Sequence, residues 1–185
     1  MHGTEAPSPW VTRWAHLLPA RARVLDLACG AGRHTRWLAQ LGHQLTAVDR
    51  DASALTGLDT LARVLCADIE DGPWPLRDER FDAVVVTHYL WRPLWPHILA
   101  SLAPGGVLLY ETFAHGNAAV GKPSRPDFLL QPGELLRLCA GLRVVAFEDG
   151  FCEAPARYLQ RIVAVREAPV PEGQAPRYPL PATPA

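Results

Sequence analysis

The chain has 185 residues, 49% of them hydrophobic, and 18 basic residues nearly balance 19 acidic ones for a net charge of −1. This length predicts one domain with a sizeable core, and the charge excludes a global basic field for nucleic acid, although not a local basic patch. Residues 1–10 lack the pattern of a secretory signal, and no apolar run approaches the roughly 20 residues of a membrane span.

Helical spacing of apolar residues marks the helices. Residues 9–18 carry a tryptophan-rich apolar face after the capping residue Ser8, and we expect these tryptophans to pack rather than to contact substrate. Asp51 or Ser53 is expected to cap a helix that runs to residue 61. Three further helices are predicted at residues 34–41, 94–102 and 134–139.

Seven apolar segments are predicted to be strands: residues 23–27, 44–48, 62–67, 81–87, 107–112, 143–149 and 159–166. The alternation of strands with helices predicts a parallel α/β sheet with right-handed crossovers. The last two strands are close enough in sequence to pair antiparallel. Residues 1–167 therefore form the expected domain, and the proline-rich residues 168–185 are expected to be an extended or disordered tail.

A glycine loop follows the first strand in the sequence V-L-D-L-A-C-G-A-G-R-H, residues 24–34. Gly30 and Gly32 can adopt a positive φ and place no Cβ in the way of a ligand. Taken alone, this glycine pair also fits an ordinary strand-to-helix turn. Cys29 in the loop is expected to be a small packing residue, since the four scattered cysteines form no C-x-x-C pair and favour free thiols in a cytoplasmic protein.

Polar residues recur where the predicted strands end. In parallel α/β sheets, ligands bind beyond the carboxyl ends of the strands, so these residues predict a site there. The residues are Asp26, Asp49, Asp68, Thr87, His88, Glu111 and Thr112.

The ordered motifs V-L-D-L-A-C-G-A-G-R, A-V-D-R-D, A-D-I-E, F-D-A-V-V-V and L-A-P-G-G-V-L-L-Y-E resemble those of class I S-adenosylmethionine-dependent methyltransferases. The resemblance covers residues 10–166 and, through F-L-L-Q-P-G-E-L-L, extends to small bacterial enzymes of the tellurite-resistance type. It implies a Rossmann-like three-layer sandwich. The sheet would be seven-stranded and mostly parallel, with an antiparallel C-terminal strand.

The resemblance also implies how S-adenosylmethionine is bound. Residues 28–32 would face its methionine part, Asp49 would bind the ribose hydroxyls, and Asp68 with the Ile69 N–H would bind the adenine. Ala28 stands where many members of the family have glycine. The full expected set of cofactor-binding residues is Asp26, Ala28, Cys29, Gly30, Gly32, Asp49, Arg50, Asp68, Ile69 and Thr87, with no metal.

Two other functions fit parts of the pattern. Gly30, Gly32 and Asp49 also resemble a nicotinamide dinucleotide fingerprint, but Thr35 occupies the position of its third glycine. A cofactor-binding module without catalysis is the second alternative. Polar residues at the ends of the fourth and fifth strands argue against it.

Methyl transfer requires a general base only if the acceptor arrives protonated. The candidates are His88, Tyr89 and Glu111, with His115 nearby, although His88 equally fits a loop histidine bonded to backbone. The (N/D)-P-P-(Y/F) motif of amino-methylating nucleic-acid enzymes is absent. We expect a small-molecule acceptor under a lid at residues 113–130, for example a thiol, an oxyanion or a soft nucleophile. A tRNA or rRNA acceptor is the alternative, and a monomer or homodimer without membrane contact is expected.

Overall fold

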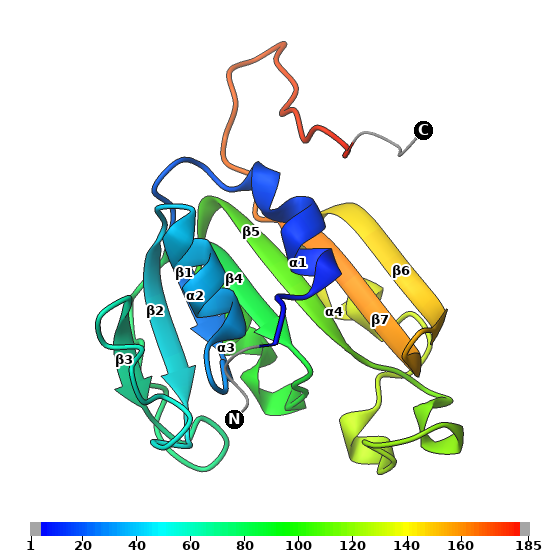
Figure 1. Ribbon diagram of the computed structural model, residues 1–185. Helices are drawn as coiled ribbons and strands as arrows, with labels where there is room; N and C mark the ends of the chain where they lie inside the picture. The colour runs from blue at the N-terminus through cyan, green and yellow to red at the C-terminus, as the bar shows by residue number, and fades with distance from the viewer. Residues whose placement is uncertain (1–4, 182–185) are drawn as a thin grey trace.

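A seven-stranded sheet forms the centre of the computed structural model, which describes residues 5–181 (Figure 1). Its strand order is β3-β2-β1-β4-β5-β7-β6. The strands are β1 (Arg23–Leu27), β2 (Gln44–Asp49), β3 (Ala62–Cys66), β4 (Phe81–Thr87), β5 (Leu102–Phe113), β6 (Arg143–Glu153) and β7 (Ala156–Val165). The strands from β3 to β5 pair parallel, whereas β7 runs antiparallel to both of its neighbours. The predicted mostly parallel sheet with an antiparallel C-terminal strand is confirmed.

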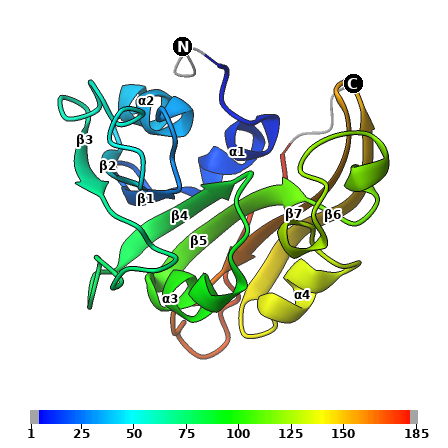
Figure 2. The same cartoon turned by 90° about the horizontal axis from the view of Figure 1, so that it is seen from below.

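Helices cover both faces of this sheet, which gives the expected three layers. On one face lie α1 (Pro9–Trp14) and α2 (Arg33–Gln40), and on the other α3 (Trp95–Ala100) and α4 (Glu134–Leu138) (Figure 2). Successive residues of a strand point to opposite faces. Val24 accordingly packs in the core beneath α1, while Leu25 and Leu27 pack in the core beneath α3.

The first helix begins as predicted. The Ser8 hydroxyl accepts a hydrogen bond from the Trp10 N–H at 3.1 Å, which caps the helix ahead of Pro9. Trp10 and Trp14 are buried, and the Trp10 indole N–H donates to the Ile162 carbonyl at 3.3 Å. The tryptophans are therefore packing residues, as the sequence predicted.

The prediction of a helix that ends at residue 61 is wrong, because residues 52–61 form turns. The Asp51 carboxylate accepts from both the N–H and the hydroxyl of Ser53, as the predicted cap would, but no helix continues from this turn. Gly57 then adopts a left-handed φ of 75°, which ends any helical path. The fifth strand also begins earlier than predicted, at Leu102, and includes Pro104, Gly105 and Gly106.

The remaining segments are irregular but in contact with the sheet layers. Residues 167–181 contain no helix or strand, yet Tyr178 packs on the core beneath α1, and the His16 Nε2 lies 2.9 Å from the Pro179 carbonyl. Between β5 and α4 the chain forms two short 3₁₀ turns, Asn117–Ala119 and Pro126–Phe128. Within residues 5–181, no helix combines the length and the apolar character that crossing a bilayer requires.

Candidate active site

The glycine loop after β1 is left-handed at three positions. Ala28 and Gly30 have φ values of 53° and Gly32 of 73°. A Cβ on Gly32 would lie 2.6 Å from the Leu58 side chain, whereas a Cβ on Gly30 would meet no atom within 4 Å. Gly32 is thus required by packing, and Gly30 leaves open space for a ligand. Ala28 adopts this conformation despite its Cβ, at a cost of roughly 1–2 kcal/mol.

Asp26 fastens this loop to the following helix. Its Oδ2 accepts from the Thr35 N–H at 2.9 Å and from the Thr35 hydroxyl at 2.6 Å. Burial raises the pKa of Asp26 to about 6, against the opposing effect of the Thr35 bonds. Thr35, where a dinucleotide fingerprint would have glycine, therefore serves a structural purpose.

Asp49 at the end of β2 connects the loop to a cavity. Its Oδ2 accepts from the Gly30 N–H at 2.7 Å and its Oδ1 from the Asp51 N–H at 2.9 Å. Each carboxylate oxygen can accept a second bond, so acceptor capacity remains. The cavity, of about 160 Å³, is lined by Ala28, Asp49, Arg50, Asp68, Ile69, Glu70 and Tyr89. The structure thus brings five of the predicted cofactor residues together around one space.

Asp68 and Ile69 contribute the far wall of this cavity. The Asp68 Oδ1 accepts from the Glu70 N–H at 2.9 Å and the Asp71 N–H at 3.2 Å. These two backbone bonds lower the pKa of Asp68, so its carboxylate is charged at neutral pH.

Five predicted cofactor residues do not line the cavity: Asp26, Cys29, Gly30, Gly32 and Thr87. The Cys29 side chain is buried against Ala47, Leu55 and Leu58, and burial raises the pKa of its thiol. Cys29 is therefore a packing residue. Thr87 lies at the end of β4 in register with Glu111, outside the cavity lining.

A second cavity of about 260 Å³ adjoins the first and shares Glu70 and Tyr89 with it. Its other walls come from the residues after β4, from the end of β5 and from the segment 113–130. These residues are His88, Leu90, Thr112, Phe113, Pro123 and Phe128. Three residues of the predicted lid therefore line this partly open cavity, whereas His115 is exposed and lies outside it.

His88 is strained and neutral. Its φ is 55°, and its N–H donates to the Glu111 carbonyl at 2.8 Å. Burial, with the nearby cations Arg33 and Arg157, lowers the pKa of His88 to about 4. Its imidazole lies 5.0 Å from the Phe113 ring and forms one wall of the second cavity. A base of this pKa is weak at neutral pH, so the geometry favours a wall residue over a general base.

Glu111 is engaged in a buried network. Its Oε1 accepts from the Ser8 hydroxyl at 2.9 Å, and its Oε2 is 3.0 Å from the Arg161 Nε. The His88 Nε2 lies 3.8 Å away. A buried carboxylate is costly unless it is paired, and these partners satisfy Glu111. Glu111 lines neither of the two cavities, so it joins the segment before α1 to the sheet.

Arg92 anchors the base of the lid. Its guanidinium donates to both Glu134 oxygens, at 2.7 and 2.9 Å, and to the Asp127 and Leu129 carbonyls at 2.8 and 3.0 Å. Sequence reasoning missed Arg92, because nothing in the sequence indicates that its partners lie about 40 positions away. It also missed Glu70, although the motif A-D-I-E places Glu70 next to two predicted contacts.

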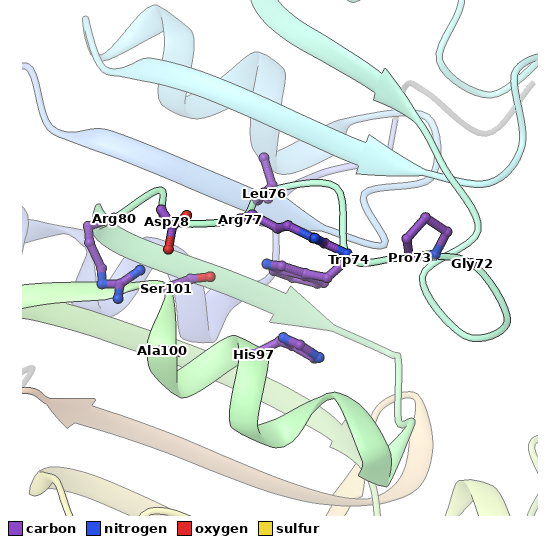
Figure 3. A pocket seen from close by; sticks show the side chains of 10 residues that line it. All are labelled: Gly72, Pro73, Trp74, Leu76, Arg77, Asp78, Arg80, His97, Ala100 and Ser101. Atoms are coloured by element: carbon purple, nitrogen blue, oxygen red, sulfur yellow. The ribbon is translucent and has the colours of Figure 1, made fainter.

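Another hollow, of about 600 Å³, lies elsewhere, between α3 and the segment 72–80 (Figure 3). Trp74 stacks on His97 there, with ring centroids 5.1 Å apart. It contains none of the predicted site residues. Among residues 5–181, no group of three His, Cys, Asp or Glu side chains could hold a metal, and the four cysteines are free thiols.

The chain is similar to known proteins in sequence and in fold. Residues 24–106 match the family model described as a methyltransferase domain. Trans-aconitate 2-methyltransferase of Variovorax paradoxus (strain S110) is 38% identical over 105 residues, which cover 51% of this chain and 39% of that protein. The chain spans about two fifths of the length of the curated relatives that it matches.

Solved structures share the fold. TehB from Haemophilus influenzae superposes with a TM-score of 0.74 at 20% identity, covering 90% of this chain and 64% of that one. The glycopeptide N-methyltransferase MtfA, complexed with S-adenosyl-L-homocysteine, superposes with a TM-score of 0.58 at 21% identity, covering 84% and 86%. At these identities the likeness shows the fold alone.

Proposed function

We propose that the protein transfers a methyl group from S-adenosylmethionine to a small-molecule acceptor, because residues 24–106 match a methyltransferase domain and the chain shares its fold with TehB. The observation that carries this proposal is the position of Asp49 between the glycine loop and the first cavity. This carboxylate holds the open glycine loop through Gly30 and also lines the adjoining cavity.

The residues present fit this cofactor. The open space at Gly30 suits the methionine part, which a side chain at this position would obstruct. Asp49 retains acceptor capacity for a vicinal diol, and Asp68 is charged beside Ile69, where an adenine amino group would find an acceptor. The acidic lining also suits a cofactor that carries a positive sulfonium and no phosphate.

When bound, S-adenosylmethionine supplies an electrophilic methyl group, so the protein contributes proximity, alignment and exclusion of water. Tyr89 and Glu70 line both cavities and mark the boundary between cofactor and acceptor. Phe113, Pro123 and Phe128 enclose the acceptor side. His88 and Glu111 position this wall, since each is bonded to backbone or to buried partners.

The size of the second cavity supports a small acceptor. At about 260 Å³ under the lid, it suits a small molecule better than a nucleotide within a folded RNA. The relative from Variovorax paradoxus is a trans-aconitate 2-methyltransferase, whose name specifies a small acceptor.

Two experiments test the proposal. Titration calorimetry should show that S-adenosylmethionine and S-adenosylhomocysteine bind with roughly micromolar affinity and that NAD does not bind. Binding of NAD alone would overturn the cofactor assignment. A radiolabelled methyl-transfer screen should then place label in small-molecule pools, and label only in total cellular RNA would favour the RNA alternative.

A further inference from the structure

We propose that the acceptor pocket selects a molecule that carries an ammonium group, with Glu70 as the residue that determines this specificity; this inference rests on the proposed function. The ammonium is the group that is recognised and not the atom that is methylated, because it has no lone pair. The acceptor pocket is the second cavity, defined by Glu70, His88, Tyr89, Leu90, Thr112, Phe113, Pro123 and Phe128. Neither the family match nor the sequence motifs assign Glu70 a role.

Glu70 is the one residue of this lining that carries a formal charge at neutral pH. His88 is the other candidate, but its depressed pKa keeps it neutral. Within residues 5–181, the Glu70 carboxylate forms no ion pair, whereas the buried Glu111 and Glu134 are both paired with arginines. Glu70 is half-buried, and Arg50 lines the first cavity with it, so on the acceptor side a cation from the ligand can form a charge-assisted hydrogen bond with the Glu70 carboxylate.

Tyr89 lies at the same place, next to Glu70. Its hydroxyl is shielded from solvent, and among the described residues no partner meets strict hydrogen-bond geometry, although the Glu70 carboxylate is close enough to act on it. Burial, the negative charge of Glu70 and hydrogen bonding to Glu70 raise the pKa of Tyr89, so the phenol keeps its proton. Glu70 and the Tyr89 hydroxyl therefore form one polar group at the boundary of both cavities, which a donor from a ligand can join.

The remaining walls suit an ammonium group on an apolar body. Phe113, Phe128 and Tyr89 present aromatic rings, which attract cations through their faces. Phe128 already makes such a contact on one side, where the Arg125 guanidinium lies 5.3 Å from its ring centroid. Arg33 and Arg157 act on His88 from outside the pocket lining, and Arg33 faces Glu5 at 3.7 Å.

The test is titration calorimetry with three probes of similar shape: benzylamine, benzyl alcohol and phenylacetate. The protein is titrated free and saturated with S-adenosylhomocysteine. We expect benzylamine to bind at least about tenfold more tightly than benzyl alcohol, and phenylacetate most weakly, as a charge-assisted hydrogen bond predicts. Glu70→Gln should abolish the preference for the amine, and Tyr89→Phe should weaken amine binding severalfold.

The matched control is Asp71→Asn, because Asp71 is the adjacent carboxylate and lies outside both cavities. It should leave the preference intact, and thermal melts should confirm that all variants are folded. Equal binding of amine and alcohol, or tighter binding of phenylacetate, would overturn the inference. Failure of S-adenosylhomocysteine to bind would overturn the proposed function instead, while the probe series on the free protein still decides the charge preference.

Discussion

The polar side chains at the carboxyl ends of the strands find their hydrogen-bond partners in two ways: one half of this edge uses partners near in sequence, and the other half uses distant ones. At the ends of β1, β2 and β3, three aspartates accept mainly backbone N–H groups that lie close in sequence. Asp26 bonds Thr35, 9 positions on, Asp49 bonds Gly30, 19 positions back, and Asp68 bonds Glu70, 2 positions on. This half lines the proposed cofactor cavity.

At the ends of β4 and β5, the polar groups pair with side chains that are distant in sequence. Glu111 accepts from Ser8, 103 positions back, His88 faces Arg33 across 55 positions, and Arg92 reaches Glu134 across 42. This half borders the proposed acceptor pocket. A binding site for a constant cofactor can thus rest on short loops, whereas the acceptor side depends on long-range packing and on the segment before α1.

The largest expected effect concerns the ends of β1, β2 and β3, where the hydrogen-bond partners lie near in sequence. Asp49→Ala removes the acceptor for the Gly30 and Asp51 N–H groups and for the proposed ribose hydroxyls. Bonds to a charged group contribute about 1.5–3 kcal/mol each, so affinity for S-adenosylhomocysteine should fall roughly 10- to 100-fold by calorimetry. Asp51→Ala, which alters only the following turn, should bind normally. Unchanged affinity in Asp49→Ala would remove this carboxylate from the site.

The next prediction concerns the ends of β4 and β5, where the partners are distant in sequence. Arg92→Ala removes four hydrogen bonds that anchor the lid, so methyl transfer to an identified acceptor should fall about tenfold while cofactor affinity stays constant. Steady-state kinetics and calorimetry would separate the two effects. Lys122→Ala is the control within the same lid, because Lys122 is exposed and forms no ion pair within residues 5–181. An equal loss of cofactor affinity in Arg92→Ala would mean that the two halves are coupled.

Acidification should also lower the free energy of unfolding, through two histidines. Burial lowers the pKa of His34 to about 3 and of His88 to about 4, so between about pH 4 and 6.5 the unfolded chain binds protons on these imidazoles that the folded protein does not. Stability should therefore fall as the pH falls through this range. Asp26 opposes the trend with one group, since its raised pKa of about 6 lets the folded state bind a proton first.

Thermal melts across this pH range should show the midpoint decreasing by several degrees. His34 Nε2 accepts from the Ser8 N–H at 3.0 Å, and the glutamine in His34→Gln can accept a hydrogen bond without titrating. This variant should lose less stability in acid than the wild type. The same acid loss in both proteins would exclude His34 as a cause.

The smallest expected effect lies within the glycine loop. Ala28→Gly relieves the left-handed strain at φ 53° but makes the unfolded chain more flexible, so a net stabilisation of at most about 1 kcal/mol is expected. Denaturant unfolding would measure it, with cofactor affinity unchanged. Marked destabilisation would show that packing of the Ala28 methyl group stabilises the fold by more than its left-handed conformation costs.

The sequence by itself determined the sheet and its antiparallel last strand, and it predicted five of the residues that line the first cavity. These features depend on the apolar periodicity of strands, on positive φ at Gly30 and Gly32, and on carboxylates such as Asp49 at strand ends, all of which are local. The helix expected before residue 61 was the local error, because Gly57 adopts a left-handed φ of 75° that interrupts a helical path.

Only the tertiary structure decided what the acids of the other half do. Glu111, a candidate base from its place at a strand end, is buried and paired with Ser8 and Arg161, whereas Glu70 lines both cavities without a cation partner within residues 5–181. Burial and pairing set the charge and availability of a carboxylate, and both depend on residues that approach one another only in the folded chain.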